Sequence, residues 1–370
     1  MKLYRDGTGK EINVPTPKEL VTFCDQYVIG QEEAKKIIAT QLYMHYKKFI
    51  LRARSTKNVA DKSNLLLIGP TGCGKTHIIK TMAKKIKVPC VIGDATNLTE
   101  AGYVGCDVET LLAGLYERAK YDMEKTQRGI VVIDEIDKLA TRSRSVLSNV
   151  TRGDVGRDGV QVSLLKMLEG SMCGVPTGTT RIHPERPLIQ MDTSNILFIG
   201  VGAFSGLEDI VRQRFNKKTV GFGAGPSIAD EADFNPFDHV SQEDLVSFGF
   251  IPEFVGRFPI ITNIAQLRNE DLVRILTEPK DAIITQYKKL FAMDNNELEF
   301  EKDALTYMAD VAIRLGTGAR ALRSIVDNVL GDFICEFADV SNCKLTITRD
   351  IVEEKLCNRY RHLSLGRRAG

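Results

Sequence analysis

The sequence predicts an α/β domain with a mostly parallel, five-stranded sheet and helices on both faces, followed by a smaller, mainly helical domain. Two observations predict this fold class. Short apolar runs alternate with helical patterns up to about residue 265, which is typical of a parallel sheet covered by helices. Beyond that point, successive helices replace the alternation. The length of 370 residues suits two to three domains.

The elements of the first domain follow from apolar spacing. Pro17 opens the first helix, because proline is tolerated at an early helical position. Apolar residues at helical spacing then predict further helices at 31–50, 75–86 and 107–120. Short apolar runs predict the five strands at 65–68, 90–92, 130–133, 196–199 and 260–262.

The second domain has a different pattern. Its expected helices span 270–291, 302–315 and 318–338, with one strand at 344–347. We therefore divide the chain into a polar leader, a large domain and a small helical domain, at residues 1–15, 16–265 and 266–365. Two stretches of the large domain lack a regular pattern and are interpreted as long functional loops, at 141–159 and 216–240.

The composition excludes several classes of protein. Lys and Arg total 50 against 48 Asp and Glu, a balance that argues against nucleic acid as a partner. No apolar run approaches the length of a membrane helix, and the first residues lack a signal-peptide pattern. The eight cysteines form no C-x-x-C pair, so we expect reduced thiols in a cytoplasmic protein and no zinc site.

A phosphate-binding loop lies between the first predicted strand and the helix at 75–86. The pattern G-x-x-x-x-G-K-[ST] wraps phosphate in backbone N–H groups at a helix N-terminus. Lys75 would reach the β- and γ-phosphates of ATP, and Thr76 would bind Mg²⁺. The residues expected to bind nucleotide here are Gly69, Pro70, Thr71, Gly72, Cys73, Gly74, Lys75, Thr76 and His77.

Two carboxylates follow the predicted strand at 130–133. Parallel sheets bind ligands at the carboxyl ends of their strands, where Asp134 and Glu135 stand. Asp134 would hold Mg²⁺ through water, and Glu135 would polarise the attacking water of a hydrolase. Hydrolysis also needs cations near the γ-phosphate. Arg257 and Arg320 are candidates, although their spacing alone does not distinguish them from surface ion-pair residues.

At this point the chain resembles the AAA+ ATPases and, within them, the ClpX group of protein unfoldases in the Clp/HSP100 family. The likeness covers residues 16 to about 357. It rests on the phosphate loop together with Tyr27–Gln31, Gly102–Gly105, Asp134–Lys138, Ile251–Phe258 and Gly318–Arg320.

The resemblance implies roles around the nucleotide. Val28 and Ile29 would line the adenine pocket. Arg257 matches an arginine finger that acts on the ATP of a neighbouring subunit, and Arg320 matches a sensor of nucleotide state. A finger that acts in trans implies a ring, which in this family is a homo-hexamer.

The resemblance also implies contacts with protein chains. Tyr103 and Val104 would grip a tagged protein substrate in a central pore, and a second pore loop would contribute Arg152. Arg181 and His183 match a basic loop around the pore entrance, with Ile182 where the family has lysine. The segment Val220, Gly221 and Phe222 matches a loop that docks onto the ClpP peptidase.

Three alternatives arise, and the first, an inactive structural ring, is disfavoured because Lys75, Glu135, Arg257 and Arg320 are all present. HslU, a sister unfoldase, carries a long insertion that does not fit between Asp134 and Arg257. A nucleic-acid motor or clamp loader on the same ATPase would need basic stripes, which the balanced charge disfavours. Full-length ClpX proteins begin with a four-cysteine zinc domain, and no part of this sequence matches it.

Overall fold

The computed structural model describes residues 2–5, 11–54, 60–99, 106–141, 153–176, 188–218, 234–337 and 340–359. It divides into two compact units, of which the first comprises residues 1–21, 33–70 and 75–264, and the second 22–32, 71–74 and 265–370. No helix among the described residues is long and apolar enough to cross a membrane. The domain boundaries drawn from the sequence remain predictions.

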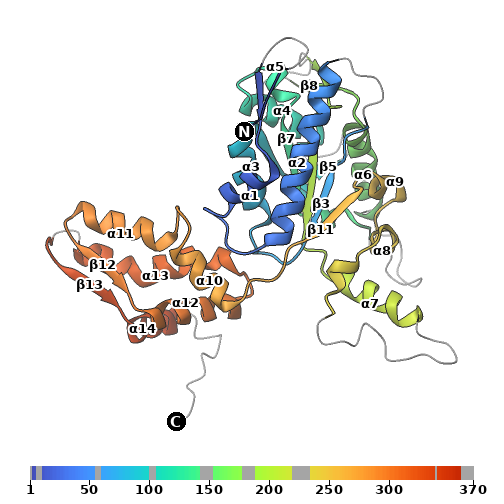
Figure 1. Cartoon of the computed structure of the whole chain (residues 1–370). Helices are drawn as coiled ribbons and strands as arrows, with labels where there is room; N and C mark the ends of the chain where they lie inside the picture. The colour runs from blue at the N-terminus through green and yellow to red at the C-terminus, as the bar shows by residue number, and fades with distance from the viewer. Residues whose placement is uncertain are drawn as a thin grey trace. The chain divides into compact units, whose positions relative to one another are not determined.

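The first unit is built on a five-stranded sheet with the order β11-β3-β10-β7-β4 (Figure 1). Every neighbouring pair in it is parallel. This confirms the predicted parallel sheet and places β3 between β11 and β10. The five strands are β3 (Leu65–Ile68), β4 (Cys90–Asp94), β7 (Ile130–Asp134), β10 (Leu197–Gly202) and β11 (Ile260–Asn263).

Both faces of this sheet are buried. Successive strand residues point to opposite faces. Leu66 and Val131 belong to a buried cluster with α4 and α6, whereas Leu65 and Val132 are buried outside that cluster. On that other face, α3 lies against β7. Hydrophobic burial on two faces explains why these strands read as continuous apolar runs.

The larger helices of the first part of the chain are α1 (Pro17–Cys24), α2 (Glu32–Ala53), α3 (Lys75–Ile86), α4 (Glu109–Arg118), α6 (Gly153–Glu169) and α7 (Leu207–Lys218). Shorter helices are η1 (Ala95–Asn97), α5 (Met123–Thr126), η2 (Ile136–Leu139), η4 (Pro236–His239), α8 (Gln242–Phe248) and α9 (Pro252–Gly256). Three two-stranded pairs join β1 (Lys2–Arg5) to β2 (Glu11–Val14), β5 (Leu98–Thr99) to β6 (Cys106–Asp107), and β8 (Met172–Pro176) to β9 (Leu188–Asp192).

Helix α6 corrects the interpretation of 141–159 as one irregular loop, since it begins at Gly153. Three glycines in its first two turns lower helix propensity and hide the pattern in the sequence. Its burial is nonetheless periodic, with Val160, Leu164 and Leu168 buried four residues apart.

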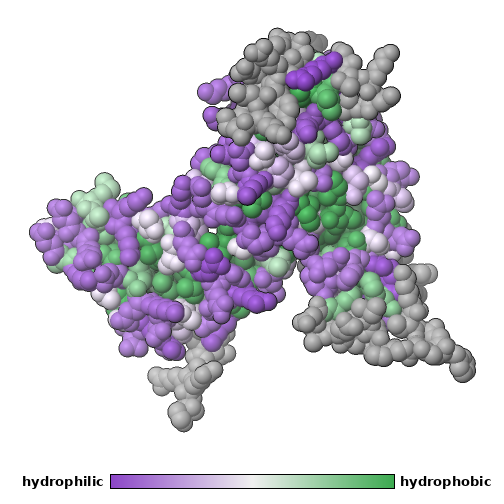
Figure 2. Space-filling view, viewed as in Figure 1, coloured by the Kyte–Doolittle hydropathy of each residue, from purple (hydrophilic) through white to green (hydrophobic). Residues whose placement is uncertain are grey.

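The second unit is mainly helical, as predicted. Its elements are α10 (Asn269–Thr277), α11 (Ile283–Met293), β12 (Glu297–Phe300), α12 (Lys302–Arg314), α13 (Ala319–Phe337), β13 (Lys344–Ile347) and α14 (Arg349–Arg359). Strand β13 pairs in parallel with β12, which the sequence interpretation missed. On the face in view in Figure 2, hydrophilic residues surround smaller hydrophobic patches on both units.

The single helix expected at 270–291 is wrong. The structure has two helices there, which are separated at residues 278–282. Pro279 stands in that gap, and proline lacks the N–H that a continuous helix requires. The apolar spacing continues across the break, which is why periodicity alone joined the two helices.

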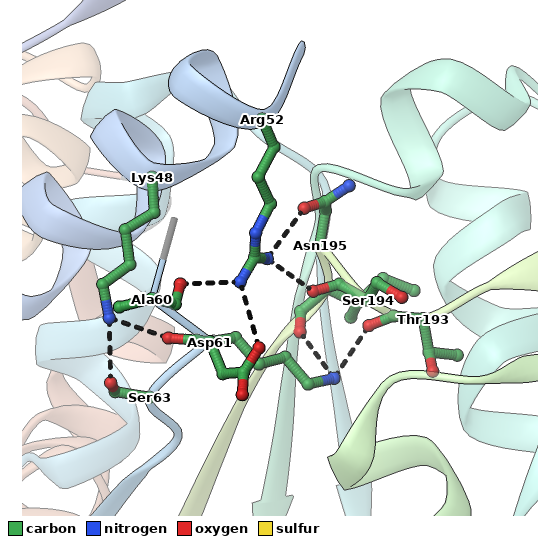
Figure 3. Close-up of polar contacts among 10 residues, drawn as sticks. Lys48, Arg52, Ala60, Asp61, Ser63, Thr193, Ser194 and Asn195 are labelled. Atoms are coloured by element: carbon green, nitrogen blue, oxygen red, sulfur yellow. Dashed lines mark hydrogen bonds and ion pairs between the residues drawn. The ribbon is translucent and has the colours of Figure 1, made fainter. Parts of the chain in front are cut away.

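A polar cluster ties α2 to the amino ends of β3 and β10 (Figure 3). The Arg52 guanidinium donates to the Ser194 carbonyl at 3.3 Å, to Asn195 Oδ1 at 3.2 Å and to the Ala60 carbonyl at 2.8 Å. Lys48 Nζ donates to the Asp61 carbonyl at 2.8 Å. Backbone carbonyls are the main acceptors, so this end of the sheet is fastened through its main chain.

Candidate functional site

The phosphate loop connects the carboxyl end of β3 to the start of α3. Its first residue is fixed from the neighbouring strand, since the Gly69 N–H donates to the Gly202 carbonyl of β10 at 3.2 Å. Gly72 and Gly74 have φ of +78° and +88°, a region that residues with a side chain rarely adopt. The glycines of the motif are therefore required by the shape of the loop.

Lys75 is the first residue of α3 and is 8% exposed. Its Nζ donates to the loop carbonyls of Gly69 at 2.6 Å and Pro70 at 2.7 Å. These acceptors are neutral, whereas a phosphate oxygen carries charge and makes a stronger, charge-assisted bond with an ammonium group. The Lys75 ammonium group is thus bound to neutral acceptors, and an anionic phosphate would be a stronger partner for it.

Thr76 and Asp134 meet across the first unit. The Thr76 hydroxyl donates to Asp134 Oδ2 at 3.1 Å, which joins the start of α3 to the carboxyl end of β7. Hydroxyl and carboxylate oxygens are the ligands that Mg²⁺ takes in nucleotide sites. The structure therefore brings together the two residues that the sequence singled out for the metal.

Glu135 follows Asp134 in a left-handed conformation with φ of +55°, and its side chain is exposed. Asp134 Oδ1 accepts its backbone N–H at 3.0 Å. A left-handed non-glycine residue beside a functional strand end is a strained position, which tertiary contacts must maintain.

Asp137 supplies one such contact, and the sequence interpretation gave it no role. It is 7% exposed, and its Oδ1 accepts the Ala203 N–H at 3.2 Å, so that the turn after β7 is fastened to the end of β10. Lys138 Nζ lies 3.4 Å from its Oδ2. The sequence shows only a carboxylate two residues after Glu135, and its burial becomes visible once the fold is known.

Within the second unit, the phosphate-loop residues 71–74 meet the start of α13. The Gly72 carbonyl accepts the Ala319 N–H at 3.2 Å, directly before Arg320. Arg320 and Thr71 are exposed, and Cys73 is buried.

The remaining nucleotide candidates are also placed. Val28 and Ile29 are buried at 7% and 6% exposure. Nearby, the Gln31 amide exchanges two hydrogen bonds with the backbone of Ala265, at 2.8 and 3.0 Å. His77 is exposed in the first turn of α3.

Arg257 stands apart from the phosphate loop, after α9 and before the amino end of β11. Its guanidinium forms an ion pair with Glu169 at the end of α6, and both side chains are 46% exposed. Since β11 and β3 are parallel, Arg257 lies at the amino ends of the strands, whereas the phosphate loop lies at their carboxyl ends. The structure therefore does not bring Arg257 to this chain's own nucleotide residues.

The predicted protein-contact residues lie outside the described residues: Tyr103, Val104, Arg152, Arg181, His183, Val220, Gly221 and Phe222. Within the described ranges, no group of three or more His, Cys, Asp or Glu residues could hold a metal ion. The expectation about zinc stays a prediction.

Comparisons with known proteins identify the family of the chain. The AAA domain (Cdc48 subfamily) matches residues 60–261, and the C-terminal, D2-small domain of ClpB protein matches residues 267–338. Curated relatives include "ATP-dependent Clp protease ATP-binding subunit ClpX" of Treponema denticola, 47% identical over 90% of this chain and 79% of the relative. Proteins of the same name in Borrelia duttonii and Porphyromonas gingivalis are 45% identical over 92% of this chain, and the matches cover 79% and 82% of those relatives.

More than half of the chain thus matches the AAA domain, and the fold, the phosphate loop and the Asp134–Glu135 pair suit a nucleotide-binding ATPase. The chain belongs to the AAA+ ATPases and, within them, to the ClpX family.

Proposed function

We propose that this ATPase is a protein unfoldase and translocase. Six copies would form a ring that binds Mg²⁺ and ATP, pulls tagged proteins through a central pore and delivers them to a ClpP-type peptidase. The names of the relatives support the link to a Clp protease. The observation that carries the ATP-hydrolysing part of the proposal is the Thr76–Asp134 contact beside the exposed Glu135 at the carboxyl end of β7.

In this proposal each group of the site has one task. Lys75 exchanges its two loop carbonyls for phosphate oxygens, a step favoured by charge. Thr76 and Asp134 hold Mg²⁺, which when bound neutralises negative charge on the phosphates. Glu135 reaches solvent from its left-handed position and orients the attacking water. Val28 and Ile29 supply an apolar surface for adenine.

The two arginines act at a distance from those groups. Arg257 is exposed at the amino ends of the strands, away from the phosphate loop at their carboxyl ends. This position suits an arginine that acts on the nucleotide of a neighbouring copy. Arg320, exposed in the first turn of α13, would report the nucleotide state. An arginine finger supplied in trans stabilises the charge that develops on the transferred phosphate. A ring of identical subunits supplies such a finger to every site.

The pore and docking roles rest on the resemblance. Tyr103 and Val104 would grip the chain, with Arg152, Arg181 and His183 along its path. An aromatic ring offers an apolar contact that depends little on the sequence of the gripped chain. Residues 220–222 would insert an apolar tip into a cleft of the peptidase.

The test is ATP-dependent unfolding of a tagged, folded fluorescent reporter, with and without ClpP. Wild type should unfold it, and ClpP should degrade the product. Tyr103→Ala should keep ATP hydrolysis within about threefold but unfold at least about tenfold more slowly, whereas Tyr103→Phe, which keeps the ring, should unfold normally. Deletion of residues 220–222 should abolish only degradation.

Unchanged unfolding by Tyr103→Ala would refute the pore assignment. Absence of unfolding by the wild type, together with ATP hydrolysis that nucleic acid stimulates, would favour the nucleic-acid motor instead.

A further inference from the structure

The carboxyl end of α6 is held at three successive residues from the amino side of the sheet. Lys62 Nζ donates to the Met167 carbonyl at 2.8 Å. Asn64 Nδ2 donates to the Leu168 carbonyl at 3.3 Å, and the Glu169 carboxylate pairs with the Arg257 guanidinium. Helix C-termini leave carbonyls without partners inside the helix, and these contacts satisfy two of them.

Asn64 makes the contact that matters most for Arg257. The same Nδ2 that reaches α6 also donates to the Arg257 carbonyl at 2.9 Å. Its Oδ1 accepts the Phe198 N–H of β10 at 3.3 Å. The side chain is 1% exposed, so water does not compete for these bonds. One amide therefore fixes the backbone of Arg257 against both β10 and α6.

The side chain of Arg257 is held more loosely than its backbone. Its ion pair with Glu169 faces solvent, with each side chain 46% exposed. Exposed pairs contribute little free energy, so the guanidinium can exchange Glu169 for another anion at small cost. The backbone of Arg257 is thus held in place, whereas its guanidinium is free to leave Glu169.

Asn64 also stands next to the strand that carries the phosphate loop. It directly precedes β3, and Gly69 directly follows β3. At roughly 3.3 Å per residue, the two ends of this strand are linked by a short, stiff connection. Asn64, which holds the Arg257 backbone, and the phosphate loop thus lie at opposite ends of one strand.

We propose that Asn64 is a positioning residue for Arg257. Through β3, it fixes the position of the arginine finger, which acts on the next subunit, relative to the phosphate loop of the same chain. The inference rests on the proposed role of Arg257 in trans. A displacement of about 1 Å in a catalytic group can cost about a hundredfold in rate, so loss of this amide should be visible in turnover.

The test uses Asn64→Leu, which removes all three hydrogen bonds with the same branched shape and number of side-chain heavy atoms, and the smaller Asn64→Ser, which keeps a hydroxyl in case the first variant folds poorly. Lys62→Met is the matched control, because it releases the same end of α6 without touching Arg257. Both Asn64 variants should lose at least about tenfold in ATP turnover, with nucleotide affinity and ring assembly preserved. Lys62→Met should stay within about threefold of wild type.

Mixed rings locate the defect. Glu135→Gln subunits cannot turn over ATP but carry an intact Arg257. Adding them to Asn64→Leu subunits should therefore raise turnover per Asn64→Leu subunit, as it should for Arg257→Ala subunits. A structural defect at the variant's own phosphate loop would not be relieved by such mixing.

Three results would overturn the inference while leaving the finger role of Arg257 intact. The first is normal turnover by both Asn64 variants. The second is equal loss in Lys62→Met, which would show a general effect of loosening α6. The third is rescue of Arg257→Ala by Glu135→Gln without rescue of the Asn64 variants. Failure of Arg257→Ala itself to be rescued would instead refute the finger role, and the inference with it.

Discussion

The two ends of the central strands treat polar groups in opposite ways. At the carboxyl end, Lys75 and Thr76 contact groups that a nucleotide and its metal could replace, and Glu135 is exposed. At the amino end, the side chains of Asn64 and Lys62 donate to backbone carbonyls, and Asn64 also accepts a backbone N–H. The first arrangement leaves groups available for ligands, and the second holds the main chain in place. We therefore call the carboxyl end of the sheet its chemical end and the amino end its fastening end.

Burial sharpens the contrast at the fastening end. It lowers the pKa of His45 to about 3 and the pKa of Lys62 to about 7, although Asp192 partly opposes the shift at Lys62. His45 Nε2 lies 3.0 Å from the Asn195 carbonyl, so the neutral ring can donate there. His45 is therefore neutral at neutral pH and serves as a hydrogen-bond donor rather than as a charge.

The largest expected effect tests the chemical end. Lys75→Met keeps the aliphatic stem and removes the cation, so ATP turnover should fall at least about a hundredfold. Because the lost partners are two loop carbonyls, the free energy of unfolding without nucleotide should change by only about 1 kcal/mol. Steady-state ATPase assays and urea unfolding measure the two quantities. A large loss of stability with normal turnover would reverse our assignment of the two ends.

A smaller effect should separate two glycines of the phosphate loop. A Cβ on Gly72 would lie 2.1 Å from the Thr317 carbonyl oxygen, whereas one on Gly74 would meet nothing within 4 Å. Both positions have positive φ, so alanine strains the backbone by about 1 kcal/mol in each. The collision is the difference. Gly72→Ala should therefore weaken ATP binding about tenfold more than Gly74→Ala, as titration with a fluorescent ATP analogue would show.

Equal weakening in the two variants would mean that the contact between Gly72 and Thr317 does not constrain the loop. In that case only the left-handed conformation would explain why glycine is needed.

A third effect concerns pH. Because the folded pKa of Lys62 is about 7 against 10.5 ordinarily, the unfolded chain binds more protons between these values. Stability contributed by this group therefore rises from pH 7 to pH 10.5 and is flat below pH 7. The unfolding free energy of wild type minus that of Lys62→Met should increase by at most about 1.4 kcal/mol per pH unit. A difference that stays constant or falls over this range would contradict the assignment.

The two ends also differ in how well the sequence predicts them. The phosphate loop is one continuous motif between a strand and a helix, and the Asp134–Glu135 pair stands at the end of another strand, so their meeting follows from parallel topology. The fastening end brings together residues up to 193 positions apart, such as Asn64 and Arg257. Each is an ordinary polar residue in the sequence, and only tertiary packing makes it specific.

The same reasoning explains the errors in secondary structure. Periodicity reports which face is buried, so it carried one predicted helix across Pro279. It failed at the start of α6, where Gly153 and Gly156 dilute the pattern. A single Gly or Pro can decide where a helix begins or ends. Predictions of helix boundaries therefore need to weigh these residues against apolar periodicity.

Glu135, directly after the carboxyl end of β7, is the residue that we propose activates water. Glu135→Gln keeps the size and polarity of the side chain but removes its charge, and Asp134, Thr76 and Lys75 remain in place. Measured together on this variant, ATP affinity should stay within about threefold of wild type, while single-turnover hydrolysis should fall at least about a hundredfold. Hydrolysis at a near-normal rate in Glu135→Gln would contradict the account.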